Sequence, residues 1–135
     1  MASARLVERV PTADEYLALR EAVGWGRPST DAVSTAMASS LFSVCLYRAT
    51  RLIGCGRVIG DGGLYFYIQD VIVLPSYQRQ GYGRQIMSAL MDYVRGHARP
   101  SAFIGLMAAQ GVAPFYQPFG FRERPAERPG MFIQL

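Results

Sequence analysis

The sequence is poor in the residues that usually bind metal ions. It contains one histidine, His97, and two cysteines, Cys45 and Cys55, and it has neither a CxxC pair nor a cluster of cysteine and histidine. These gaps exclude the common zinc-ligand spacings, so we expect no metal site. The two cysteines lie in apolar stretches typical of neighbouring strands, which favours two reduced thiols in the core.

Long apolar runs are missing as well. A membrane-spanning helix needs roughly 18 apolar residues in a row, whereas glycine, arginine or proline interrupts the longest apolar stretches of this chain. Residues Met1–Arg5 also lack the apolar core of a secretory signal peptide. The sequence therefore predicts a cytoplasmic protein that does not associate with membranes.

Lysine is absent, and all 14 basic residues are arginine. With 10 acidic residues the formal net charge is +4, which suits either nucleic acid or a ligand with several phosphates. The arginines are scattered, no three are consecutive, and no recognition helix or RNA-binding signature occurs. We therefore expect no nucleic-acid partner; a steep salt dependence of DNA affinity would indicate the opposite.

The residues that are present suit a folded domain. Half of the sequence is hydrophobic and 18% is charged, a composition that fills a core and argues against disorder. A length of 135 residues suits one domain, which we expect to occupy residues 1–135.

Hydrophobic periodicity and turn residues predict elements in the order β-α-α-β-β-β-α-β-α-β. This order indicates an α/β fold, in which a mixed sheet is covered by helices and two strands run parallel on either side of a helix. The first helix begins at the capping box Thr12-Ala-Asp-Glu15, with Tyr16, Leu19 and Val23 on one face. The helix Gly83–His97 carries a broad apolar stripe that consists of Ile86, Met87, Leu90, Met91 and Val94. The expected strands are Leu6–Val10, Ser43–Ala49, Leu52–Ile59, Leu64–Leu74, Ala102–Met107 and Met131–Leu135; the other helices begin at Ser29 or Thr30 and span Gly83–His97 and Val112–Pro118.

A glycine-rich turn between the longest strand and the helix after it carries the chemistry. Gly81 and Gly83 allow a tight turn and a close approach of the backbone to a ligand. The unpaired N–H groups and the dipole of a helix N-terminus favour an anion such as pyrophosphate. Gln78, Arg79 and Arg84 can add further donors around it.

Other phosphate-binding loops fit this turn less well. A P-loop requires Gly-Lys-Ser/Thr, but Arg84 and Gln85 follow Gly83. A dinucleotide fingerprint requires a small third residue where Ile86 stands. On the glycines alone, a plain strand-to-helix turn without a ligand remains the alternative.

Two segments resemble one known family. Gln78-Arg-Gln-Gly81-Tyr-Gly83 is similar to the Q/R-x-x-G-x-G/A motif of the GNAT superfamily of N-acetyltransferases, in the same strand–turn–helix setting. Ala113-Pro-Phe-Tyr116-Gln-Pro-Phe-Gly-Phe121 looks like the A-x-x-F-Y-x-x-x-G-F segment of that family. The resemblance covers Arg48 to Phe121 well and the rest only by element order. It implies a GNAT-like mixed, splayed β-sheet flanked by helices.

The resemblance also implies a binding mode for acetyl-CoA. In the family, a bulge splays the strand before the motif from its parallel neighbour, and the exposed backbone pairs with the pantetheine arm. The implied residues are Val71, Ile72 and Val73 for the pantetheine, Gln78, Arg79, Gln80, Gly81, Tyr82, Gly83 and Arg84 for the pyrophosphate, and Gln110, where many members have an asparagine that bonds the pantetheine.

The family's usual general acid corresponds to Tyr116. Attack by an amine expels a thiolate, and a phenol with a pKa of about 10 stays protonated at neutral pH and can donate to the sulfur. The alternative is that Tyr116 only packs with Phe115 and Phe119. Asp70 is a candidate base, although it could instead anchor the neighbouring turn.

Weaker candidates for the base are Asp61 and Glu21, whereas Gln69 cannot titrate. The implied reaction is acetyl transfer from acetyl-CoA to the amine of an acceptor, with a small molecule favoured over a folded protein. Trp25, Phe42, Tyr65 and Tyr67 could line the acceptor side. The alternative function is a non-catalytic CoA-binding sensor or interaction module. The apolar end of the chain further suggests a homodimer.

Overall fold

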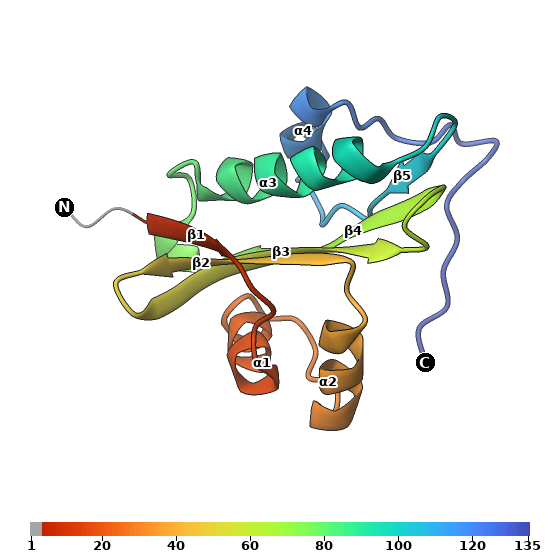
Figure 1. Ribbon diagram of the computed structural model, residues 1–135. Helices are drawn as coiled ribbons and strands as arrows, with labels where there is room; N and C mark the ends of the chain where they lie inside the picture. The colour runs from red at the N-terminus through yellow and green to blue at the C-terminus, as the bar shows by residue number, and fades with distance from the viewer. Residues whose placement is uncertain (1–3) are drawn as a thin grey trace.

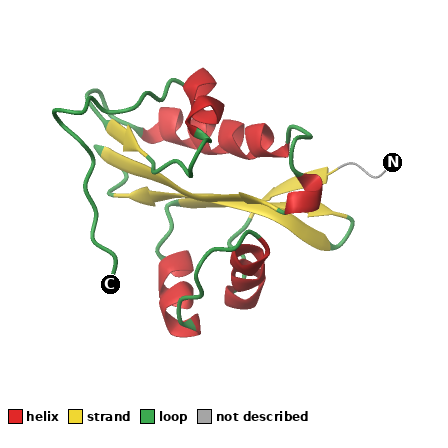
Figure 2. Ribbon diagram, turned by 180° about the vertical axis from the view of Figure 1, so that it is seen from behind, coloured by secondary structure: helices red, strands yellow, loops and turns green. Residues whose placement is uncertain are grey.

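A five-stranded sheet separates the helices into two layers (Figure 1). The computed structural model describes residues 4–135. Helices α3 and α4 cover one face of the sheet, and α1 and α2 cover the other (Figure 2). The strands are β1 (Ala4–Glu8), β2 (Phe42–Arg48), β3 (Arg51–Gly60), β4 (Tyr65–Val73) and β5 (Phe103–Gly105); the helices are α1 (Ala13–Ala22), α2 (Thr30–Ala38), α3 (Tyr82–His97) and α4 (Ala113–Tyr116), with 3-10 turns η1 (Pro75–Tyr77) and η2 (Gln117–Phe119).

Neighbouring strands in the sequence are also neighbours in the sheet. The strand order is β1-β2-β3-β4-β5. The first four strands pair antiparallel, and β4 pairs with β5 in parallel across the α3 connection. The predicted α/β fold is confirmed, as is the order of the elements from β1 to α4.

Side-chain caps begin the two helices that precede the hairpin. The Thr12 hydroxyl accepts a hydrogen bond from the N–H of Glu15 at 3.1 Å, and the Glu15 carboxylate accepts one from the N–H of Thr12 at 2.9 Å. For α2, the Ser29 hydroxyl accepts from the N–H of Ala32 at 3.2 Å, which decides between the two predicted caps. Each bond satisfies an amide that has no partner inside its helix.

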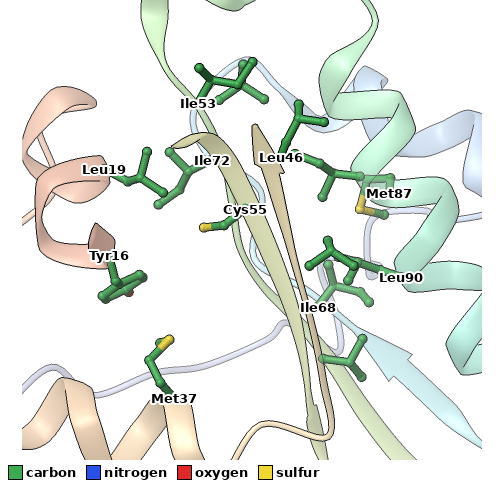
Figure 3. Packing of buried hydrophobic residues seen from close by; sticks show 14 of the residues in the cluster. Tyr16, Leu19, Met37, Leu46, Ile53, Cys55, Ile68, Ile72, Met87 and Leu90 are labelled. Carbon is green, nitrogen blue, oxygen red and sulfur yellow. The ribbon is translucent and has the colours of Figure 1, made fainter. Parts of the chain in front are cut away.

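The hydrophobic core lies on both faces of the sheet (Figure 3). The predicted apolar stripe of α3 is buried and faces Leu46 and Ile68 of the sheet. On the other face, side chains of α1 and α2 lie opposite Cys55 and Ile72. The stripe consists of Ile86, Met87, Leu90, Met91 and Val94.

Cys45 and Cys55 are free, buried and opposite each other in β2 and β3. Burial raises the pKa of Cys45 to about 11 and the pKa of Cys55 well above its usual value. Both thiols therefore keep their protons at neutral pH, as expected for core thiols.

The prediction of a final strand at Met131–Leu135 is wrong. These residues pair with no strand in the described part of the chain, and Met131, Phe132, Ile133 and Leu135 are exposed. Apolar residues favour a strand only where a neighbouring strand offers its backbone. The predicted strand Ala102–Met107 likewise shortens to β5, since β4 pairs with only three of its residues.

Two glycines of β3 allow α3 to lie close against the sheet. A Cβ atom added at Gly56 would lie 2.6 Å from Cγ2 of Ile86 and 3.0 Å from Cδ1 of Leu90. A Cβ atom at Gly54 would lie 2.7 Å from the carbonyl oxygen of Ile72 in β4 and 3.2 Å from Cδ1 of Ile86 in α3. Larger residues at these positions would displace α3, whose first turn belongs to the site described below.

Gly56→Ala is expected to lower the free energy of unfolding by about 1–3 kcal/mol, because an extra methyl group overpacks a filled interior. Gly96→Ala in α3 is the control. A Cβ at Gly96 meets no atom within 4 Å, so this change should stabilise the helix by about 0.5–1 kcal/mol. Urea unfolding of both variants measures the difference; equal effects would contradict the close approach of α3.

Candidate functional site

A β-bulge interrupts β4 at its middle. Arg57 pairs with Gln69 and Cys55 pairs with Ile72, so two residues of β4, Asp70 and Val71, lie opposite the single residue Gly56. Asp70 has a φ of 58°, in the left-handed region that few residues other than glycine adopt. Such a bulge bends the strand and changes its direction.

Downstream of the bulge, one edge of β4 is open. β5 pairs only with Tyr65–Tyr67, although β4 continues to Val73. The N–H of Leu74 donates to the carbonyl of Ile53 in β3 at 2.8 Å. Along a strand, successive residues direct their N–H and C=O groups to opposite sides. Ile72 therefore faces β3, whereas the backbones of Val71 and Val73 face the gap beside β5. The predicted splayed strand is present, but Ile72 uses its backbone within the sheet.

The side chain of Gln78 links the open edge to the glycine-rich turn. Its Nε2 donates to the carbonyl of Val73 at 2.9 Å, so one acceptor of the edge is already satisfied. Gln80 donates to the carbonyl of Ser76 at 3.4 Å. These bonds hold the loop against the end of β4, and they leave the N–H of Val73 facing the gap.

The turn leaves the first backbone amides of α3, here called the bare amides, without a hydrogen-bond partner inside the helix. Gly81 has a φ of 87°, and no side chain caps the helix. The first intrahelical bond runs from the N–H of Gln85 to the carbonyl of Gly81 at 3.1 Å. The amides of residues 82–84 therefore have no partner inside the helix, and the helix dipole adds positive potential there. Arg79 and Arg84 are exposed beside them.

Gly83 brings α4 to this helix terminus. A Cβ at Gly83 would lie 3.2 Å from Cζ of Phe115, so α4 packs directly on the first turn of α3. Phe115 in turn meets Tyr116 edge to face, with ring centroids 5.0 Å apart. Burial raises the pKa of Tyr116 above its ordinary value, which keeps the phenol protonated at neutral pH. Gln110 is exposed in the loop before α4.

Asp70 lies on the opposite side of the sheet from α3 and is almost fully buried. Its Oδ2 accepts from Nε of Arg57 at 2.8 Å, and its Oδ1 accepts from the hydroxyl of Tyr16 at 2.8 Å and from Nε2 of Gln69 at 3.2 Å. Burial, together with the charge of Asp70, raises the pKa of Tyr16 to about 12. The sequence offered no signal for this group, because Tyr16 and Arg57 are far from Asp70 in the chain.

The weaker candidates for the base occupy other surroundings. Oδ1 of Asp61 accepts from the N–H groups of Gly63, Leu64 and Tyr65 at 2.8, 2.9 and 3.1 Å. These bonds lower the pKa of Asp61, which makes it a weak base at the β3–β4 turn. Glu21 lies with Trp25 around a hollow of about 260 Å³ at the α1–α2 turn.

Comparisons with known proteins agree on one family. The acetyltransferase (GNAT) domain family matches residues 39–123. The N-acetyltransferase ycf52 of Porphyra purpurea is 33% identical over 118 residues, which cover 84% of this chain and 67% of that protein. The histone acetyltransferase TAP1 of Glycine max is 31% identical and covers 85% of this chain and 54% of its own length. The chain thus spans between half and two thirds of these relatives.

A solved structure matches almost the whole chain. The crystal structure of a probable acetyltransferase from methicillin-resistant Staphylococcus aureus superposes with a TM-score of 0.93 at 38% identity, covering 98% of this chain and 100% of that one. The fold and the matched family thus define an α/β acetyltransferase. The chain belongs to the GNAT family.

No helix within residues 4–135 is long and apolar enough to cross a membrane. Over the same residues, no three of the histidine, cysteine, aspartate and glutamate side chains gather as a group that could hold a metal ion.

Gly83→Glu and Gly83→Gln form a matched pair that tests the anion site. Both add similar bulk beside Phe115, but only glutamate adds negative charge at the bare amides. We expect Gly83→Glu to bind CoA at least about tenfold more weakly than Gly83→Gln, since like charges a few ångströms apart repel by more than the ~1.4 kcal/mol this requires. Calorimetry at low salt measures both affinities, and equal values in folded variants would exclude an anion at this turn.

Proposed function

We propose that the protein transfers the acetyl group of acetyl-CoA to the amine of a small-molecule acceptor, with Tyr116 as general acid. One observation carries the proposal: the turn that follows the open edge of β4 ends at the bare amides of α3, and Gln78 ties that turn to Val73. An extended amide-containing arm can pair with the backbones of Val71 and Val73 as an added strand does. The helix terminus that follows suits the pyrophosphate.

The proposed roles of the individual residues follow from this path. The amides of Tyr82, Gly83 and Arg84 hold the pyrophosphate, and Arg79 adds positive charge. Gln80 and Gly81 shape the turn, while Gln78 anchors it to Val73. In this proposal Gln110 donates to the pantetheine from the loop before α4. Ile72 contributes by keeping the strand in the sheet.

The chemistry asks for one proton to be delivered to the sulfur and, when the acceptor starts as an ammonium, for two protons to leave its nitrogen. The amine nitrogen bonds to the thioester carbonyl carbon, and the carbon–sulfur bond then breaks. The Tyr116 phenol donates its proton to the departing sulfur, and its raised pKa keeps that proton available. The nitrogen loses one proton before it attacks and a second after the carbon–nitrogen bond forms. These protons pass to water or to a carboxylate, for which Asp70 is the candidate from the sequence.

The proposed acceptor is a small amine. The hollow at the α1–α2 turn has a volume of about 260 Å³, and the residues that line it include Glu21, Trp25 and Arg27. The carboxylate of Glu21 suits a cationic amine, whereas the Trp25 ring already has the guanidinium of Arg20 at 5.7 Å. Phe42 stacks on Tyr93 with ring centroids 4.7 Å apart, so it serves packing. The cytoplasmic location stays a prediction from the sequence.

Tyr116→Phe separates catalysis from packing. It removes one oxygen, so the fold and the affinity for acetyl-CoA should persist while kcat falls by roughly 10²–10⁴-fold. The loss should shrink for acyl donors whose thiol leaves more easily. Assays of thiol release with a set of amines and acyl donors measure kcat for both proteins. Unchanged kcat would refute the general acid, and absence of thiol release from the wild type with every amine would favour the non-catalytic CoA-binding alternative.

We further propose that two copies of the chain associate through the exposed C-terminal residues. Ile133 is 88% exposed, and exposed apolar residues in a row mark an interaction surface. Light scattering should give twice the monomer mass, and Ile133→Asp should restore the monomer, whereas the neighbouring Gln134→Asp should not. A monomer at high wild-type concentration would contradict the pairing.

A further inference from the structure

The bulge in β4 is held from the face of the sheet that α1 and α2 cover. The side chain of Asp70 is 1% exposed and pairs with Arg57, whose side chain is 12% exposed. Nη1 of Arg57 also donates to the carbonyl of Ala36 and to the hydroxyl of Ser40, both at 3.2 Å. The bulge is thereby tied to β3 and to the C-terminal end of α2.

Both the backbone carbonyl and the side chain of Asp70 accept hydrogen bonds. Its carboxylate accepts three hydrogen bonds, and its carbonyl oxygen accepts one from the thiol of Cys55 at 3.4 Å. A residue other than glycine with a φ of 58° persists only where its surroundings hold it. Here the buried partners of Asp70 supply that restraint, at the residue where the strand turns away from β5.

The same network reaches the α1–α2 turn. The hydroxyl of Tyr16, which donates to Asp70, accepts from Nη1 of Arg20 at 2.9 Å. Nε of Arg20 donates to the carbonyl of Gly26 at 2.6 Å, and its guanidinium lies 5.7 Å from the Trp25 ring. Trp25 and Gly26 line the hollow at this turn. A chain of direct contacts thus joins the bulge to the proposed acceptor side.

We propose that Asp70 is a positioning residue: through Tyr16 and Arg57 it fixes the bulge that presents Val71 and Val73 to acetyl-CoA, and it couples this edge to the α1–α2 turn. The proposal rests on the proposed function, since it takes that edge to be the binding surface. The burial of the carboxylate and the occupation of both its oxygens favour this role over proton abstraction. The two roles predict different kinetics.

Tyr16→Phe is the first test, because it removes one oxygen from the middle of the network and keeps the ring in the core. CoA affinity, measured by calorimetry, should fall by about tenfold, the effect of losing a hydrogen bond to a charged group. Tyr47→Phe is the control. The Tyr47 hydroxyl is buried without a hydrogen-bond partner in the described part of the chain, so its loss should leave CoA affinity unchanged.

Asp70→Asn distinguishes positioning from proton abstraction. Positioning predicts weaker CoA binding and a retained acidic limb in the pH profile of kcat. A base predicts unchanged CoA binding, a loss of kcat of roughly 10²–10⁴-fold, and no acidic limb; that result would overturn the proposal.

Tyr16→Phe remains decisive if Asp70→Asn does not fold, because a folded Tyr16→Phe with wild-type CoA affinity also overturns the proposal. Failure of the wild type to bind CoA would instead refute the proposed function.

Discussion

Between the pairs Arg57–Gln69 and Cys55–Ile72, β4 contains one residue more than β3. The extra residue interrupts the pairing of β3 with β4 just beyond the part of β4 that pairs with β5. The remaining residues of β4 therefore keep backbone groups unpaired on the β5 side, up to the turn before α3. Gly56 opposite the extra residue has no side chain, and Ile86 and Leu90 of α3 occupy the free space. The β-bulge and Gly56 therefore together determine where the open edge of β4 lies relative to the start of α3.

Elements defined by local signals were predictable. The capping box at Thr12 and the apolar stripe of α3 both depend on residues a few positions apart, and both are confirmed. The final segment Met131–Leu135 has the composition of a strand, but a strand exists only by pairing, and its composition says nothing about an available partner. The length of β5 was overestimated for the same reason, since its partner turns away.

The candidate site likewise contains residues that the sequence predicted and residues that it did not. The glycine-rich turn and Tyr116 stand in contiguous motifs, so the sequence pointed to them directly. The network around Asp70 joins positions 16, 57 and 70, and the Tyr16–Asp70 bond spans 54 positions. Tyr16 was expected on the apolar face of its helix, and it is there, but its hydroxyl adds a polar contact that periodicity cannot register. Gln78 was expected to donate to a ligand, and in the structure its Nε2 donates to the carbonyl of Val73, a contact that the motif did not indicate.

The three longer helices begin in two ways. Thr12 and Ser29 cap α1 and α2 with their own hydroxyls, whereas α3 begins at Gly81 with no such group. The first turn of α3 therefore lacks the side-chain acceptor that α1 and α2 have, and an anion bound there would supply it. Any ligand that does so stabilises the folded state by mass action, in proportion to the logarithm of its concentration over its Kd. The lifetime of the folded protein would then rise with the concentration of that ligand, because the ligand pairs with the amides that the helix leaves unpaired.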